Sequence, residues 1–187
     1  MLVGLGKEDD ADVHAYRKAG AAVVAARKKT HGTDLTVRFA GASIECMGAF
    51  AEGMLLRDYS YDEYKMQKEE DKEAERSVRI TCDEGQEEDL QALVNIHTGV
   101  ASGVHLSRDL GNCPPNDMYP EAFSDMAWEW AKQYNNVDVT IINYEHAMKA
   151  GMGGLVAVGM GSSRKPCMVI FDCLLYTSPS PRDALTS

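Results

Sequence analysis

The sequence contains few residues that could crosslink a small protein. Its cysteines are widely spaced, odd in number and form no C-x-x-C pair; they are Cys46, Cys82, Cys113, Cys167 and Cys173. This spacing fits neither a disulfide framework nor a zinc ribbon. We therefore expect reduced cysteines and a cytoplasmic location.

Long hydrophobic runs and targeting signals are also missing. The most apolar stretch, residues 151–160, is well short of the ~20 residues that a membrane-spanning helix needs. No basic segment precedes the apolar residues 2–6, and the charged residues 7–10 follow them at once. We expect no membrane partner.

Positive charge is scarce as well. Lys and Arg number 19 against 29 Asp and Glu, which gives a formal net charge of -10. This balance excludes a broad phosphate-binding surface, so we expect no nucleic-acid partner. The 187 residues are 44% hydrophobic and 26% charged, as in a globular protein of one domain, or of one and part of a second.

The first half of the chain alternates between strand and helix patterns. Strands are expected at residues 2–5, 35–39 and 77–81. Between them, Asp9 or Asp10 is expected to cap a helix that runs to about residue 29 and buries Val13, Tyr16, Ala19, Val23 and Ala26. Ser43 is expected to cap a second helix. This order predicts an α/β architecture, in which the charge run 65–76 forms a solvated loop.

The second half begins with a long helix, expected at residues 84–110 and broken by Pro114 and Pro115. Pro120 is well placed to start another helix, which runs to residue 134 with Phe123 facing inward. Strand patterns follow at residues 137–142, 155–158 and 168–171, with a short helix at 144–150 that Gly151 ends. The predicted second α/β unit therefore begins near Gly111.

No catalytic constellation is visible in the residues themselves. The turn at residues 4–7 lacks the P-loop spacing, and the glycine turn at 159–163 is not followed by a helix pattern. His14, His31, His97, His105 and His146 show no metal-ligand spacing, and no serine lies in a G-x-S-x-G elbow. We assign no catalytic and no metal-binding residue, and the substrate-binding residues stay unknown.

Several stretches together nevertheless form a familiar series. They are residues 2–7 (LVGLGK), 50–56 (FAEGMLL) with Tyr59, Tyr61 and Tyr64, then 107–116 (SRDLGNCPPN), 151–155 (GMGGL) and 158–162 (VGMGS). In order and spacing they resemble the leucyl aminopeptidases of the M17 metallopeptidase family. The third stretch is similar to the family's "ARDLVNTPPN" junction, and the last two are similar to its "LGMGALLAVGQGS" run.

The resemblance implies a domain plan. Residues 1–84 would form part of a macro-like N-terminal α/β domain, residues 85–110 a linker helix, and residues 111–172 the opening of an α/β/α peptidase domain. The family's next motif, "GKGVTFDSGG", does not follow Asp172. Residues 173–187 are instead rich in Ser, Pro and Thr, so we expect a disordered tail that is foreign to the family. A natural disordered tail is the alternative.

The resemblance also implies a chemistry. Family members hydrolyse the N-terminal residue of peptides with two divalent ions, zinc or manganese, and a Lys and an Arg that stabilise the oxyanion. They are expected to assemble as homo-hexamers. The metal ligands lie downstream of Asp172 in the family, so we carry over no residue and expect this chain to bind no metal and to be inactive.

A stand-alone binding module is the second hypothesis. The family's N-terminal domain resembles macro domains, which bind nucleotide sugars, and such a module could bind that ligand or a protein partner without catalysis. The missing phosphate-loop chemistry argues against it.

Overall fold

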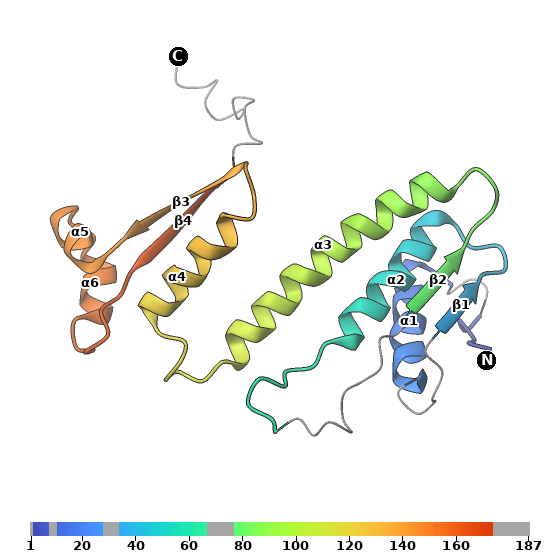
Figure 1. The fold of residues 1–187 in the computed structure, drawn as a ribbon, viewed down its shortest axis with the longest axis horizontal. Coiled ribbons are helices and arrows are strands. Elements are labelled where there is room, and N and C mark those ends of the chain that lie inside the picture. The colour runs from blue at the N-terminus through green and yellow to red at the C-terminus, as the bar shows by residue number, and fades with distance from the viewer. Residues whose placement is uncertain (1, 8–10, 28–33, 67–76, 174–187) are drawn as a thin grey trace, which may run out of the picture. The chain divides into compact units, whose positions relative to one another are not determined.

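The computed structural model describes residues 2–7, 11–27, 34–66 and 77–173. The chain divides into two compact units, Met1–Asn112 and Cys113–Ser187. Figure 1 shows both, with the first unit in blue to green and the second in yellow to red. Residues 67–76, which hold most of the expected charged loop, and residues 174–187 of the expected tail lie outside the described residues.

Unit 1 is a small α/β layer structure with a long helix. Its elements in chain order are α1 (Val13–Arg27), β1 (Asp34–Arg38), α2 (Ile44–Asp58), β2 (Ser77–Thr81) and α3 (Glu87–Asn112). β1 and β2 pair in parallel, with Leu35 opposite Val78 and Val37 opposite Ile80. Parallel strands need a crossover connection, which α2 provides here. The α/β architecture is therefore confirmed.

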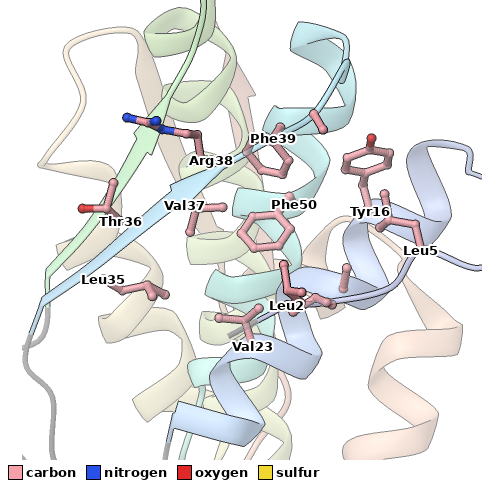
Figure 2. Close-up of a pocket in the computed structure, with 13 residues that line it drawn as sticks. Leu2, Leu5, Tyr16, Val23, Leu35, Thr36, Val37, Arg38, Phe39 and Phe50 are labelled. Atoms are coloured by element: carbon pink, nitrogen blue, oxygen red, sulfur yellow. The ribbon is translucent and has the colours of Figure 1, made fainter.

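Side chains of β1 point alternately into the core of unit 1 and away from it. Leu35 and Val37 pack against the helices, whereas Thr36 and Arg38 point away from them (Figure 2). The helices contribute the buried side chains Tyr16, Ala19, Val23, Val24, Phe50 and Met54. Tyr16, Ala19 and Val23 were expected there, but Val13 is 41% exposed. It lies at the first position of α1.

Two glycines let the backbones of α1 and α2 touch. A Cβ atom on Gly20 would lie 2.1 Å from the carbonyl oxygen of Phe50, and one on Gly53 would lie 1.9 Å from that of Arg17. No side chain larger than hydrogen fits at either distance. The helix pair, and with it the core beneath β1, therefore depends on both positions.

Unit 2 is built around an antiparallel strand pair. Its elements are α4 (Pro120–Ala131), β3 (Val137–Ile142), α5 (Tyr144–Lys149), α6 (Gly153–Gly159) and β4 (Met168–Cys173). Val139 lies opposite Phe171, and the ring of Phe171 packs edge-on against Trp130 of α4, with 5.6 Å between the ring centroids. α4 therefore covers the face of the sheet that carries Phe171 (Figure 1). Among the described residues, no helix in either unit combines the length and apolarity needed to cross a membrane.

Three further expected details are wrong, and a fourth concerns α4. Residues 155–158 belong to helix α6 and not to a strand, because a run of four apolar residues fits a short helix equally well. Residues 2–5 form no strand, and Leu2 is fully exposed. At α1, Asp12 accepts the hydrogen bond of the Ala15 amide at 2.8 Å, the interaction that we expected from Asp9 or Asp10. Phe123 of α4 is 37% exposed, so it is not the inward residue that its spacing predicted.

Other local expectations are confirmed. Ser43 caps α2 by accepting from the Cys46 amide, and Gly151 follows α5 with a φ of 70°. The long helix α3 begins and ends two residues later than the expected 85–110, immediately before Cys113 and Pro114.

Candidate functional site

Residues 107–112, the part of the stretch 107–116 that belongs to α3, lie beside the end of α2. The last carbonyl groups of a helix have no partner within it and need one from elsewhere. His105 of α3 bonds the carbonyl of Leu55 through Nε2 at 3.1 Å, and Arg108 Nη1 donates to the carbonyl of Leu56 at 3.0 Å. Side chains of α3 therefore complete the end of α2.

Tyr59, which follows α2, is the centre of this junction. Its hydroxyl donates to Asp109 Oδ1 at 2.8 Å and accepts from Asn112 Nδ2 at 3.0 Å, and the Arg108 guanidinium lies 5.3 Å from its ring centroid. Desolvation, and then the hydrogen bond to Asp109, raise the pKa of Tyr59. We name Tyr59, His105, Arg108, Asp109 and Asn112 the junction cluster.

The sequence analysis placed four of these residues in family-like stretches and His105 among the histidines without metal-ligand spacing, and it gave none of them a role. The four members on α3 lie at i, i+3, i+4 and i+7, the spacing of a single helix face, and this was the available signal. Their contacts hold two helices together. The junction cluster is a structural site.

A half-buried polar group connects all three long helices of unit 1. Glu52 Oε2 of α2 lies 3.0 Å from Arg17 Nη2 of α1 and 3.0 Å from His97 Nδ1 of α3. Gly48 makes room for the imidazole, since a Cβ there would lie 3.1 Å from the ring atoms of His97. His97 is thus a half-buried histidine with a carboxylate partner.

The described residues do not supply a metal site. His97 and His105 are held in the contacts above, His14 and His146 are exposed, and His31 lies outside the described residues. Within residues 2–7, 11–27, 34–66 and 77–173, no three His, Cys, Asp or Glu side chains gather around a point that could hold a metal ion. This part of the chain therefore contains no group of ligands for the two metal ions of the family that the sequence resembles.

Unit 1 contains an apolar cavity of about 350 Å³ between α1 and β1 (Figure 2). Tyr16, Val37, Phe39 and Phe50 line it, and the segment with Leu2 and Leu5 runs along one side. The pKa of Tyr16 is raised, first by desolvation and then by Cys46. This cavity suits an apolar group and carries no paired acid and base.

A second, more polar cavity of about 330 Å³ lies where β1 and β2 end. Arg38, Gly41, Thr81 and Asp83 line it. In α/β folds the carboxyl ends of parallel strands are the usual ligand position. One cation and one carboxylate make this cavity mixed in charge.

The glycine turn of unit 2 uses its polar groups internally. Ser162 Oγ accepts from the Arg164 amide at 3.1 Å, and Lys165 Nζ donates to the carbonyls of Met160 and Ser162. Gly159 is required by packing, because a Cβ there would lie 2.2 Å from Pro166. The turn is therefore structural, in agreement with the interpretation favoured from the sequence.

The folds and contacts define an α/β unit joined through one long helix to a further α/β unit. Two protein-family models match the chain in this order. The model of the cytosol aminopeptidase family, N-terminal domain, matches residues 1–68, and that of the same family's catalytic domain matches residues 105–183. The chain belongs to the cytosol aminopeptidase family, M17.

Curated relatives and solved structures agree with this assignment. A probable cytosol aminopeptidase of Rhizobium leguminosarum bv. trifolii is 35% identical over 173 residues, which are 91% of this chain and 34% of the relative. One from Pseudomonas aeruginosa is 30% identical over 176 residues, 91% of this chain and 35% of the relative. The chain thus spans about a third of the length of these relatives.

Two solved structures share the fold. The bottromycin maturation enzyme BotP in complex with Mn has a TM-score of 0.76 at 30% identity, over 90% of this chain and 35% of that one. A tomato leucine aminopeptidase mutant, K354E, has a TM-score of 0.76 at 25% identity, over 90% of this chain and 34% of that one. The arrangement of helices and strands described above is therefore that of the family.

Proposed function

We propose that this chain is the N-terminal part of a metal-dependent aminopeptidase that releases N-terminal amino acids, of leucine type, from peptides. The observation that carries the proposal is the pair of family matches, in the family's order, on either side of α3. In this proposal residues 1–84 are part of the N-terminal domain, 85–110 the linker helix and 111–172 the start of the peptidase domain.

The proposed cofactors are two divalent ions, zinc or manganese. Manganese has the support of the BotP complex, which contains Mn. Peptides are the proposed substrates, a homo-hexamer the proposed assembly of the full-length protein, and the cytosol, named in the relatives' descriptions, the proposed location.

We also propose that these 187 residues alone bind no metal tightly and hydrolyse no peptide. In the family the ligands follow the strand that corresponds to β4, and the described part of the chain gathers no ligand group of its own. Residues 173–187 are proposed to be foreign sequence. Two observations weigh against that last point: Cys173 still pairs with Val137, and the catalytic-domain match extends to residue 183.

A chimera tests the function. Residues 1–172 would replace the corresponding first third of the Rhizobium relative, and hydrolysis of leucine amide would be measured with manganese, with zinc and after chelation. We expect metal-dependent hydrolysis in the chimera and none with the 187-residue chain. A chimera that folds and binds metal but releases no amino acid would contradict the proposal.

The binding-module hypothesis has one observation in its favour, the polar cavity at the ends of β1 and β2. A nucleotide sugar such as ADP-ribose would place its diphosphate near Arg38 and the N-terminus of α2. Calorimetry with ADP-ribose tests the nucleotide-sugar form of this hypothesis: saturable binding that Arg38→Ala removes supports it, and the absence of saturable binding contradicts it.

A further inference from the structure

Helix α3 contributes little to the interior of unit 1, although it is the longest helix there. Of its 26 residues, only Leu90 and Ala101 are buried. The buried cluster of unit 1 and the apolar side chains packed against it, as far as the structure describes them, include no residue of α3. α3 therefore lies outside that core, alongside α2 (Figure 1).

Polar side chains attach α3 to α2 instead. Near the middle of α3, His97 Nδ1 lies 3.0 Å from Glu52 Oε2, and near its end the junction cluster bonds the last residues of α2. The contacts of Arg108, Asp109 and Asn112 are exposed. Exposed hydrogen bonds are exchanged for bonds to water when the helices separate, so each adds only a small net stabilisation. The attachment of α3 is therefore weaker than the apolar core that joins α1, α2 and β1.

The sequence of α3 gives the helix little stability of its own. Glycine is a poor helix former, and Gly99, Gly103 and Gly111 all lie within it. From residue 90 to residue 107 it contains no Asp, Glu, Lys or Arg, so no ion pair between successive turns supports it there. α3 therefore depends on its contacts with α2 to remain helical, as most protein helices depend on tertiary packing.

The contact at Glu52 allows α3 to leave without damage to the core. Glu52 Oε2 also lies 3.0 Å from Arg17 Nη2 of α1. If His97 moves away, Glu52 keeps a cationic partner, so no charge is left unpaired between α1 and α2. The close contact at Gly20 and Gly53 is made between the backbones of α1 and α2. Both helices can therefore stay folded while α3 opens.

We propose that α3 undocks from α2 and unfolds as one unit while α1, α2, β1 and β2 stay folded. The transition of a single segment between order and disorder is a common switching element in proteins. Because unit 2 follows Asn112 directly, opening changes the segment that leads into unit 2 from a helix to a flexible chain. This inference does not depend on the aminopeptidase function.

Native-state hydrogen exchange of the 187-residue chain tests the proposal without any substitution. We expect the amides of residues 93–110 to be protected about a hundredfold less than those of Val23 and Phe50, and to exchange at rates that rise together at low urea concentration. Equal protection of α3 and the core, with the same dependence on urea, would show a single cooperative unit and overturn the proposal. Amides of α3 without protection would overturn it too, because the helix would then not be docked.

Two neighbouring substitutions then test the contact at Glu52. His97→Ala removes it, whereas Thr98→Ala is the matched control, because Thr98 is exposed and bonds the Val94 carbonyl of its own helix. Alanine favours the helix at both positions. We expect His97→Ala to accelerate exchange throughout α3 at least roughly tenfold, the factor for a lost hydrogen bond to a charged group, without a change in the core amides. Thr98→Ala should not accelerate exchange, and equal rates in the two variants would contradict the proposal.

A substitution near the other end shows whether α3 opens as one unit. Arg108→Ala removes the bond to the Leu56 carbonyl, about 16 Å along the helix from His97. If α3 opens as a whole, exchange should accelerate by the same factor at residues 93–97 and at residues 105–110. Acceleration confined to the turn around the substituted residue would mean local fraying and would overturn the proposal, as would equal acceleration in α3 and in the core.

Discussion

The two units bury different kinds of side chain. In unit 1 the interior holds large residues from two helices, among them Tyr16, Val23, Phe50 and Met54. In the described part of unit 2 the buried apolar residues are three alanines, Ala127, Ala131 and Ala147, and the large ones, such as Phe171, remain partly exposed. Unit 2 therefore has defined helices and strands around very little core.

The difference shows that secondary structure and stability are separate properties. Burying a large apolar side chain contributes about 1.5–3 kcal/mol, whereas an alanine contributes far less. A two-stranded sheet is marginally stable by itself. We conclude that unit 1 holds most of the folding free energy of the described chain, and that unit 2 depends on additional packing.

Two matched phenylalanines provide the strongest test of this comparison. Phe50 packs edge-on against Phe39 and is 4% exposed, while Phe171 packs edge-on against Trp130 and is 47% exposed. Phe50→Ala should lower the free energy of unfolding of unit 1 by about 4 kcal/mol, and Phe171→Ala should cost about 1 kcal/mol. Urea denaturation followed by hydrogen exchange of each unit measures both. Equal losses would show that unit 2 has a core of its own.

The helix contact in unit 1 should be nearly as sensitive. Gly53→Ala would force a methyl group onto the Arg17 carbonyl, and because backbone must move, we expect a loss of about 3 kcal/mol. Gly111→Ala, in open space on α3, is the matched control and should be neutral or stabilising by up to about 1 kcal/mol. If thermal melts show that Gly111→Ala destabilises the chain more than Gly53→Ala, the close contact is disproved.

Substitutions at the helix caps should have smaller effects on stability and also compare the two units. Ser43 accepts from the Cys46 amide at the start of α2, and Asn143 accepts from the His146 amide at the start of α5. Each substitution by Ala should cost about 1 kcal/mol. Ser43→Ala should lower the unfolding midpoint of all of unit 1, whereas Asn143→Ala should change hydrogen exchange only around α5. A global effect of Asn143→Ala would mean that unit 2 folds cooperatively.

The cap of α2 should also make the stability of unit 1 decrease at acid pH. The Ser43 hydroxyl, and then a backbone hydrogen bond, lower the pKa of Glu45 below 4.5. A lowered pKa adds stability above 4.5 that is lost as pH falls through the folded-state value. The urea midpoint of unit 1 should therefore fall less on acidification in Glu45→Gln than in the unmodified chain.

The smallest expected effect is at the junction cluster, at alkaline pH. The folded-state pKa of Tyr59 is above 10, so its contribution is present below pH 10 and is lost as pH rises through the raised value. Tyr59→Phe should reduce this loss of stability at alkaline pH without abolishing it, because the pKa of Tyr16 is raised too. Unfolding midpoints on both sides of pH 10, with tyrosinate absorbance, measure the change. If Tyr59→Phe loses as much stability above pH 10 as the unmodified chain, the contacts of Tyr59 do not raise its pKa.

Local signals in the sequence predicted much of this fold. The Ser43 cap, the turn at Gly151 and the end of α3 before Pro114 each depend on the chemistry of one or two neighbouring residues. Residues 155–158 were predicted wrongly because four apolar residues have no readable period. The strand expected at residues 2–5 failed for a different reason: a strand exists only when another strand pairs with it, and none of the described strands does.

The contacts between elements could not be predicted in the same way. The partner of Tyr59 is 50 residues away in the chain, and the requirement for glycine at position 53 arises from the backbone of another helix. Such contacts depend on the tertiary arrangement and leave little trace in local patterns. The resemblance to a family supplied the domain plan that periodicity alone could not.

The junction cluster has a consequence for how relatives of this chain are recognised. Arg108, Asp109 and Asn112 belong to the stretch 107–116, which resembles a family motif, and their contacts join two helices. A search pattern built on them detects an intact joint between helices and carries no information on whether metal ligands follow. A chain that has lost its chemistry but kept this joint would still be found, so catalytic competence has to be established from other residues.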